Sequence, residues 1–547
     1  MHEGRYGGHF MPNQRLVLFI TLLLLTGNSM AFDDPEVTRA KEAALRPGVL
    51  PAWETRAEIN SSPVTVPFVT DMSQGLLTPP PDPGYRVPAE FEPVSAYMVS
   101  QGDWGGMDNM LLNLIKGGTL QGGAHAIVLS KDPPQQYASY LENKGIDMSM
   151  IRVIQPPGGL NAKWARDFGP VSIYEGGTDG NLAFADFHYY DSRARDDAVV
   201  EHLAQLASLE RFGLEGGDQS PADQVKLYME GGNYMTDGRG TCIMSNDIPA
   251  DNQKDGNTDA DSFEKVEEIL ASYLGCVKII WLTPVPNTST GHVDMYAKLV
   301  TPIDVIVIDF DSATGNNAQA DPIVDENADI IENETNLDGE GFIVHRVVIP
   351  PLDSGMMGWT YKTYTNSVML NNVVLVPTYN AQTYDTAALD LYRDILGEDY
   401  TVQGIPAVSI AFEGGAVHCT TMQIASACGN GVRDEFLFEQ CEGDDLDGET
   451  CESLGEKAGQ LACDDACNFD TSGCTGSDSD TDADTDSDSD TDADSDSAPD
   501  GGQWDAALDE GIEEDDADYA GGCGCSYAGS TLSGPVLLLA SHLLSII

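Results

Sequence analysis

The sequence predicts an α/β domain followed by a small disulfide-rich module and a disordered acidic tail. Apolar, β-branched runs alternate with amphipathic stretches over residues 90–427, six cysteines are concentrated in residues 428–474, and Ser, Asp, Thr and Ala repeat through residues 477–497. Alternating strands and helices form α/β domains. Dense cysteines are typical of disulfide-stapled modules, and a charged polar repeat cannot bury a core.

Residues 1–31 have the pattern of a secretory signal peptide. Arg15 precedes an apolar run at residues 16–25, and Ser29-Met30-Ala31 offers a small-x-small cleavage site. The run is too short to span a membrane, since a spanning helix needs roughly 20 apolar residues. Residues 32–74, which are rich in Pro, Thr and Glu, are expected to form an extended lead-in.

The α/β domain is expected to occupy residues 75–427. Short apolar runs predict buried strands, and amphipathic stretches between them predict helices. The predicted strands include residues 126–129, 277–282, 305–310 and 373–377, and the predicted helices include residues 261–274 and 386–396. Two acidic segments, residues 247–261 and 321–334, do not match an EF-hand and are expected to be flexible insertions.

The C-terminal part of the sequence divides into three segments. Residues 428–474 contain six cysteines and no histidine, so disulfides of undetermined pairing are expected in preference to a zinc site. Residues 475–522 contain Asp and Glu but no Lys or Arg, which predicts a solvated acidic spacer. Residues 523–547, a Cys-Gly-Cys sequence and an apolar run, resemble a myxobacterial-type sorting signal. With the signal peptide, this resemblance implies a protein secreted by a Gram-negative bacterium or attached to its outer membrane or cell surface.

The charge of the chain limits its partners. The sequence holds 27 basic and 89 acidic residues, and its formal net charge is −62. Such a chain does not bind nucleic acid by neutralising phosphates. Its field instead favours cationic substrates.

Four stretches of the α/β domain place a charged or nucleophilic side chain beside Gly or Pro, as rigid turns at a pocket do. They are Trp164-Ala165-Arg166-Asp167-Phe168-Gly169-Pro170, Glu230-Gly231-Gly232-Asn233, Gly291-His292-Val293-Asp294 and Glu413-Gly414-Gly415-Ala416-Val417-His418-Cys419. Together they supply what hydrolysis of a guanidinium group requires. Paired carboxylates such as Asp167 and Asp294 grip the planar cation. A thiolate such as Cys419 attacks its poorly electrophilic carbon, and an imidazole such as His292 protonates the leaving amine.

In this order the four motifs resemble those of the agmatine deiminase and bacterial (Porphyromonas-type) peptidyl-arginine deiminase family. The resemblance covers residues 75–427 and implies the pentein fold, a five-bladed α/β propeller with a central active site. It implies that Cys419 forms a covalent thiouronium intermediate and that His292 protonates ammonia and then activates water. It also implies that Asp167 and Asp294 hold the guanidinium nitrogens. The chemistry needs no metal or other cofactor.

The same resemblance assigns further substrate-binding residues. Asn366, in Thr363-Tyr364-Thr365-Asn366-Ser367, matches an active-site Asn of the family, and Trp164 is expected to wall the pocket. Glu230 either binds substrate or braces its Gly-Gly turn. Arg193 and Arg195 resemble the Arg-x-Arg segment with which the peptidyl-arginine branch binds a substrate carboxylate; as ordinary surface residues they would only balance nearby acidic charge.

These features favour arginine in peptides or proteins, at the C-terminus, as the substrate that is converted to citrulline and ammonia. Gly291 before His292 is instead typical of the agmatine branch, and Ser289 stands where the peptidyl branch has a carboxylate-binding Tyr. Agmatine deimination to N-carbamoylputrescine is therefore the alternative. A surface binding protein with a vestigial deiminase domain is a second alternative, and an amidinotransferase would share the fold and the covalent step.

Cys419 also has two simpler interpretations. An isolated cysteine is more often a buried core residue than a nucleophile, and Cys419 could also pair with Cys428. A papain-like protease is excluded because its nucleophile precedes its histidine, whereas His292 precedes Cys419 here.

Overall fold

The computed structural model describes residues 41–42, 45, 49–61, 85–102, 104, 108–176, 181–214, 225–311, 320–352 and 361–475. The predicted signal peptide, nearly all of the acidic spacer and the C-terminal tail lie outside these residues. Only parts of the predicted lead-in are described. None of the helices in the described ranges is long and apolar enough to cross a membrane.

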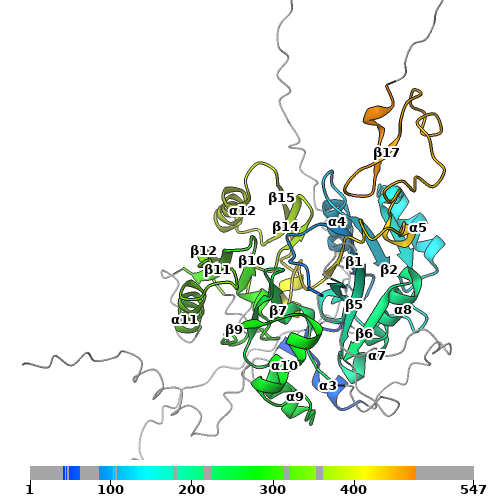
Figure 1. Cartoon of the computed structure of the whole chain (residues 1–547). Coiled ribbons are helices and arrows are strands. Elements are labelled where there is room, and N and C mark those ends of the chain that lie inside the picture. The colour runs from blue at the N-terminus through cyan, green and yellow to red at the C-terminus, as the bar shows by residue number, and fades with distance from the viewer. Residues whose placement is uncertain are drawn as a thin grey trace, which may run out of the picture. The chain divides into compact units, whose positions relative to one another are not determined.

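Five small sheets of the α/β domain are arranged about a common centre (Figure 1). In four of them the first strand is antiparallel to the second, and the second is parallel to the third. These sheets are β4 (Val171–Tyr174), β5 (Leu182–Phe187) and β6 (Glu210–Leu214); β7 (Tyr234–Thr236), β8 (Thr241–Ser245) and β9 (Lys278–Leu282); β10 (Ala297–Leu299), β11 (Asp304–Phe310) and β12 (Ile343–Ile349); and β13 (Val368–Leu370), β14 (Val373–Thr378) and β15 (Thr401–Pro406). The repeated pattern makes each sheet one blade of a propeller.

The fifth sheet closes the ring. It consists of β16 (Thr421–Ala425), β1 (Val94–Ser100), β2 (His125–Leu129) and β3 (Ile151–Ile154), in that order. The last strand of the domain, β16, pairs antiparallel with its first, β1, with Met98 opposite Met422. Joining the two ends of the domain in one blade leaves the propeller without a break between its first and last segments.

Helices lie at the periphery of the blades (Figure 1). The longer ones are α4 (Asp108–Gly118), α5 (Pro134–Asn143), α8 (Val199–Ala207), α10 (Phe263–Tyr273), α11 (Asp321–Glu332) and α12 (Gln382–Leu396), and the shorter ones are α7 (Ala194–Asp197) and α9 (Ile248–Lys254). They bury their apolar faces against the sheets, as in α10, where Val266, Ile269 and Leu270 recur at helical spacing. The short helix α6 (Ala165–Phe168) is instead buried and contacts β1 and β16.

The predicted strands and helices named above all form, with bounds that differ by a few residues. The prediction of two flexible acidic insertions is wrong. Residues 248–254 form α9 and residues 321–332 form α11. In α11 the buried residues Val324, Ala328 and Ile331 lie on one face, and the acidic residues occupy the other positions. The acidic segment 321–332 contains apolar residues at helical spacing, about 3.6 residues per turn. The segment forms a helix because these residues pack against β11 and β12.

The cysteine-rich module is stapled by three disulfides, Cys428–Cys467, Cys441–Cys463 and Cys451–Cys474. It contains the short strands β17 (Ala462–Cys463) and β18 (Phe469–Asp470). Cys242 and Cys276 form a fourth disulfide between β8 and the segment before β9. Among the described cysteines only Cys419 is free, so the possible Cys419–Cys428 disulfide does not form.

The described part of the lead-in is packed on the domain instead of extending from it. We call residues 49–61 the N-terminal strap. It contains one helical turn, α3 (Arg56–Ile59), whose capping box joins Thr55 to Glu58. Ala52 of the strap is fully buried, and its backbone N–H donates to the carbonyl of Glu413 at 2.8 Å. The strap therefore reaches the segment that carries Cys419.

Candidate active site

The sequence motifs converge because each precedes the first strand of a blade. Asp167 lies in α6 before β4, Glu230 lies before the turn η3 (Gly231–Asn233) and β7, and Asn366 lies shortly before β13. His292 and Asp294 belong to the turn η4 (Val293–Met295) before β10, and Cys419 lies between η5 (Ile410–Glu413) and β16. Contacts of α6 with η3 and β16, and of η3 with η4, bring these turns together. Every blade thus contributes a side chain to one central cluster.

Cys419 is fully buried and is held by Asn366. Asn366 Nδ2 lies 3.0 Å from Cys419 Sγ and 3.0 Å from Asp294 Oδ2, to which it donates. Asn366 Oδ1 accepts from the backbone N–H groups of Ala416 at 2.9 Å and Cys419 at 3.3 Å. Cys419 Sγ also lies 3.5 Å from Asp294 Oδ2. One amide side chain therefore fixes the position of the thiol relative to a carboxylate.

His292 lies between two other carboxylates. Its Nδ1 is 3.7 Å from Asp167 Oδ1, and its Nε2 is 3.6 Å from Glu230 Oε2. Within the described residues, neither carboxylate oxygen of Asp167 has a hydrogen-bond partner, nor has Asp294 Oδ1. Buried carboxylate oxygens normally accept hydrogen bonds. These unsatisfied acceptors are suited to the N–H groups of a bound cation.

Two glycines of the motifs are required by close approach. A Cβ atom on Gly232 would lie 2.7 Å from His292 Nδ1 and 3.2 Å from Asp167 Oδ1. A Cβ atom on Gly415 would lie 2.8 Å from Cys419 Sγ and 2.7 Å from Cζ3 of Trp164. Any larger residue at either position would fill the space between the reactive groups.

The charges of the cluster are strongly coupled. Burial raises the pKa of Asp167 to about 8, against an opposing effect of His292. Burial alone would lower the pKa of His292, but Glu230, Asp167 and Asp294 outweigh it and raise that pKa to about 10. Burial, reinforced by Asp294 and Asp167, raises the pKa of Cys419 well above its usual value. Without a bound cation, His292 is protonated at neutral pH and the thiol is not ionised.

Asp294 is held in its charged form by a residue that the sequence analysis did not assign. Burial favours its protonation, but the hydrogen bond from His418 lowers its pKa below the usual value. His418 Nδ1 lies 2.7 Å from Asp294 Oδ2, and His418 Nε2 lies 2.9 Å from Glu90 Oε2. Glu90 in turn pairs with Lys298. His418 directly precedes Cys419 in its motif, so the sequence offered a signal for it. Glu90 lies far from every motif in the sequence, so no such signal existed for it.

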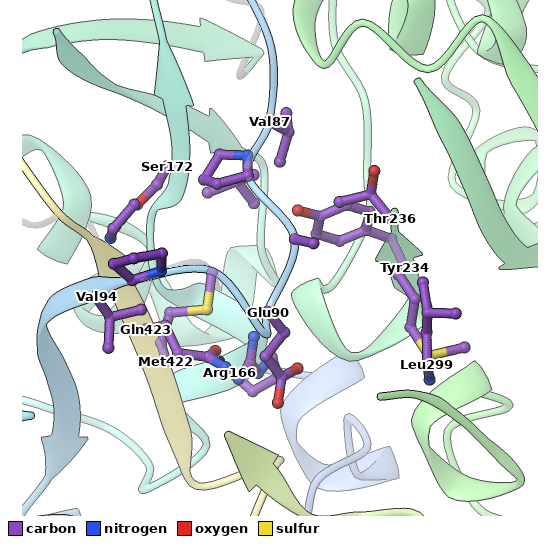
Figure 2. Close-up of a pocket in the computed structure, with 16 residues that line it drawn as sticks. Val87, Glu90, Val94, Arg166, Ser172, Tyr234, Thr236, Leu299, Met422 and Gln423 are labelled. Atoms are coloured by element: carbon purple, nitrogen blue, oxygen red, sulfur yellow. Dashed lines mark hydrogen bonds between the residues drawn. The ribbon is translucent and has the colours of Figure 1, made fainter. Parts of the chain in front are cut away.

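A cavity lies behind this network and is separate from the cluster around Cys419. Figure 2 shows Glu90, Arg166, Tyr234, Met422 and Gln423 among the residues that line the cavity. Arg166 bonds the Gln423 side chain, while its neighbour Asp167 belongs to the catalytic cluster. Arg166 and Asp167, two successive residues of α6, therefore have different surroundings: Arg166 lines the cavity, and Asp167 belongs to the cluster around Cys419.

Trp164 is fully buried beside Cys419, as the expected pocket wall requires. Its indole Nε1 donates to the carbonyl of Leu50 in the N-terminal strap at 2.9 Å. Lys163 Nζ lies 4.7 Å from the centre of the Trp164 ring and 2.6 Å from Glu413 Oε2. The strap and a buried ion pair thus fix the orientation of the indole.

The two arginines expected to bind a substrate carboxylate are not brought together as a free pair. Arg193 is fully buried and pairs with Glu58 of the strap, with 2.8 Å between Nε and Oε1 and 3.1 Å between Nη2 and Oε2. Arg195 is exposed. Arg193 and Arg195 are two residues apart around the start of α7, where alternate residues do not share a helical face. Of the two guanidinium groups, only that of Arg193 is buried, and it is already paired with Glu58.

Among the residues that the structure describes, two groups of side chains outside the cluster have a spacing that could hold a metal ion. Cys428, Glu442 and Cys467 form one group, but both cysteines belong to a disulfide. Asp309, Asp321 and Asp325 form the other, and Arg346 pairs with two of its members, Asp309 and Asp325.

Known proteins share both the sequence pattern and the fold. A family model described as Porphyromonas-type peptidyl-arginine deiminase matches residues 118–425, more than half of the chain. A Legionella pneumophila protein provisionally named agmatine deiminase is 25% identical over 281 residues, which is 50% of this chain and 74% of that protein. A Latilactobacillus sakei protein provisionally given the same name is 27% identical over 298 residues, covering 48% of this chain and 75% of that protein.

Solved structures confirm the architecture. The agmatine deiminase of Enterococcus faecalis superposes with a TM-score of 0.53 at 20% identity, covering 65% of this chain and 100% of that chain. A Porphyromonas gingivalis structure provisionally named an arginine deiminase gives a TM-score of 0.53 at 18% identity, covering 63% of this chain and 99% of that chain. The expected pentein fold is therefore correct. The chain belongs to the Porphyromonas-type peptidyl-arginine deiminase family, whose members are hydrolases of guanidino C–N bonds.

Proposed function

We propose that the central cluster hydrolyses the guanidinium group of an arginine-like substrate, with Cys419 as nucleophile and His292 as proton donor. The observation that carries this proposal is the free buried thiol of Cys419 at hydrogen-bond distance from Asn366 and Asp294. The unsatisfied carboxylate oxygens of Asp167 and Asp294 belong to the same cluster. The nucleophile, the cation-binding groups and the acid are thus present together.

In the first half of the reaction, Asp167 and Asp294 hold the guanidinium nitrogens through charge-assisted hydrogen bonds. The bound cation offsets the negative charges that disfavour the Cys419 thiolate, so binding favours ionisation of the thiol, whose proton is released to solvent because His292 is already protonated. The sulfur attacks the guanidinium carbon, a C–S bond forms, and the C=N electrons move to nitrogen. Protonated His292 then gives a proton to the leaving nitrogen as the C–N bond breaks. Ammonia departs and an S-alkylthiouronium remains.

In the second half, neutral His292 takes a proton from water while the oxygen adds to the thiouronium carbon. The C–S bond breaks as the C–O bond becomes a carbonyl, the hydroxyl proton passes to the departing thiolate, and the Cys419 thiol and a ureido product result. Glu230 stabilises the imidazolium form of His292 in both halves, because it lies 3.6 Å from His292 Nε2. Trp164, which is fully buried beside Cys419, forms the apolar wall next to the reacting carbon.

The substrate is proposed to be arginine in a peptide or protein, which would be converted to citrulline, or agmatine. The family name supports the first class, and the relatives that bear agmatine deiminase in their names support the second. We also propose export and attachment to the cell surface, which rest on the signal-like N-terminus and the C-terminal sequence alone. The four disulfides are in keeping with an oxidising environment.

The test is release of ammonia and ureido product by the full chain from agmatine, from a peptide with internal arginine and from a peptide ending in arginine. Wild type is expected to turn over at least one of them, and C419A none. Mass spectrometry of acid-quenched wild type is expected to detect the thiouronium adduct on Cys419. Release of ammonia only when an acceptor amine is added would assign the chain as an amidinotransferase. No turnover of any compound would favour the surface binding protein with a vestigial domain.

A further inference from the structure

The N-terminal strap packs against the segment that leads to Cys419. The backbone N–H of Ala52 donates to the carbonyl of Glu413 at 2.8 Å. Trp53 lies against Gly414, where a Cβ atom would be 2.8 Å from the indole ring. Ala52 is fully buried and Trp53 is 7% exposed, so this part of the strap is packed as closely as the core.

At a second point the strap contacts the wall of the pocket. The Leu50 carbonyl accepts a hydrogen bond from the Trp164 indole at 2.9 Å. Trp164 is three residues before Asp167, and its ring lies beside Cys419. A buried indole N–H needs an acceptor, so the strap supplies part of what holds this wall in place.

A third contact joins the N-terminal region to the loop before His292. Lys41, which precedes the strap, donates to the Asn287 carbonyl at 3.0 Å and to the Ser289 hydroxyl at 2.6 Å. Its ammonium group also lies 5.9 Å from the centre of the Trp53 ring. The segments that lead to His292 and to Cys419 belong to different blades. N-terminal residues that contact both segments therefore lie across the space between them.

The C-terminal half of the strap is tied to the residues before α7. Glu58 of α3 pairs with Arg193, with 2.8 Å between Nε and Oε1, and Figure 1 shows α3 close to α7. Ser192 Oγ donates to Glu54 Oε1 at 2.6 Å. Arg193 is fully buried, and leaving a buried charge without its partner is costly. The ion pair therefore holds the strap against the domain.

The reacting groups are closed off beneath these contacts. Cys419, His292, Asp167 and Asp294 are each at most 4% exposed, so a guanidinium group can reach them only if part of their surroundings moves. The strap belongs to none of the sheets, and the ring of blades is closed by β1 and β16. Release of the strap breaks no strand pairing. Segments of this kind open at a lower free energy than the blades unfold.

We propose that the N-terminal strap is a cover of the active site, held down by the Glu58–Arg193 ion pair, which must lift for a substrate to reach Cys419. This inference concerns the same site as the proposed deiminase function and takes the identity of the substrate from it. Lifting removes the strap from Trp164 and Gly414 while the blades remain paired. Opening and closing of the strap are then steps of each turnover.

The first test measures access to Cys419 in the full chain and does not depend on turnover. The rates of alkylation by iodoacetamide and by the bulkier pyrene maleimide are determined at Cys419 by peptide mass spectrometry. Both reagents react with the thiolate, so the ratio of the two rates reports access to the sulfur and not its ionisation. A cover that lifts more often admits the larger reagent more readily, which raises the maleimide-to-iodoacetamide ratio.

E58Q is expected to raise this ratio about tenfold, because the closed position then leaves the charge of Arg193 unpaired. E92Q is the matched control. It breaks the partly buried ion pair of Glu92 with Arg86, in the segment before β1, and is expected to leave the ratio unchanged. If E58Q does not fold, S192A removes only the bond to Glu54 and is expected to raise the ratio roughly threefold.

The second test locks the strap in place. In the double variant E54C/S192C the two introduced thiols replace side chains that are in contact, and dibromobimane bridges neighbouring thiols. The bridged chain is expected to release no ammonia from agmatine or from arginine peptides. E54C and S192C alone, treated with the same reagent, are expected to retain turnover.

Undiminished turnover by the bridged chain, or the same ratio of alkylation rates in E58Q and E92Q, overturns the inference and leaves the deiminase proposal standing. Absence of ammonia from untreated wild type with every substrate, together with a raised ratio in E58Q, overturns the proposed function and leaves the cover of the thiol standing. Thermal unfolding of each variant separates a folding defect from a change in access.

Discussion

His418 connects Asp294 to Glu90 through its two ring nitrogens, at 2.7 Å from Nδ1 to Asp294 Oδ2 and 2.9 Å from Nε2 to Glu90 Oε2. Burial, with the charges of Arg166 and Lys298, keeps the pKa of His418 below its usual value, so the ring is neutral at neutral pH. A neutral imidazole has one N–H, and in the tautomer with the proton on Nδ1 it donates to the carboxylate of Asp294. The carboxylate of Asp294 is thereby kept charged and oriented towards Cys419.

Replacing His418 is expected to lower kcat because Asp294 loses the hydrogen bond that favours its charged form. A hydrogen bond to a charged group contributes about 1.5–3 kcal/mol, which corresponds to roughly 10- to 150-fold in rate. H418A is expected to show this loss, and H418N, whose amide can replace the Nδ1 donor, is expected to recover much of it. The acid limb of the kcat profile should also move to higher pH in H418A, since the pKa of Asp294 rises. Equal losses in both variants with an unmoved profile would mean a purely structural role.

The affinity for a cationic guanidine is expected to increase with pH between about pH 6 and 9. Burial raises the pKa of Asp167 to about 8, so the carboxyl is protonated below that pH and charged above it. A guanidinium binds the charged form, so its KM should fall by up to about tenfold per unit of pH until the free-enzyme pKa is passed. D167N should have a high KM with little pH dependence. A wild-type KM for agmatine that does not change over this range would contradict the pKa assigned to Asp167.

Adding one methyl group at Gly232 is expected to abolish turnover. The new Cβ atom would lie 2.7 Å from His292 Nδ1, which is closer than Cβ atoms in folded proteins approach other atoms, and 3.1 Å from Asp294 Oδ2, which is a tight contact. G232A should therefore reduce kcat/KM by at least 100-fold. G341A is the matched control, because a Cβ atom at Gly341 would meet nothing within 4 Å. Comparable activity losses in the two variants would show that the distances around Gly232 do not limit the reaction.

A negative charge in place of the Asn366 amide is expected to suppress ionisation of Cys419. Asn366 Nδ2 donates towards both Cys419 Sγ and Asp294 Oδ2, each at 3.0 Å. Burial raises the pKa of the thiol, and the contact with Asn366 partly opposes that rise. N366D keeps the shape but places a further carboxylate against these groups. Alkylation of Cys419 by iodoacetamide should require a higher pH in N366D, and kcat should fall at least tenfold. An unchanged alkylation profile would exclude this role for Asn366.

Much of the site could be predicted because its residues occur in short motifs. Asp167, Glu230, His292, Asp294 and Cys419 lie within such motifs, and the structure gathers all of them with Asn366 in one cluster. Glu90 could not be predicted: it is 328 residues from His418, and no local pattern connects them. The expectation that Arg193 and Arg195 bind a substrate carboxylate could not be checked from the sequence, because it depends on which residues surround them. Arg193 pairs with Glu58, which is 135 residues away in the sequence.

The sequence by itself determined the alternation of strands and helices, the disulfide-rich module and the chemical groups of the site, because periodicity, cysteine density and residue type are local properties. Only the tertiary structure decided that the acidic segment 321–332 is a helix, that Cys419 remains unpaired, and that the strap covers Arg193. The reason is that these outcomes depend on which distant surfaces meet. Burial against β11 and β12 orders the helix, and a buried arginine takes the nearest carboxylate that can neutralise it.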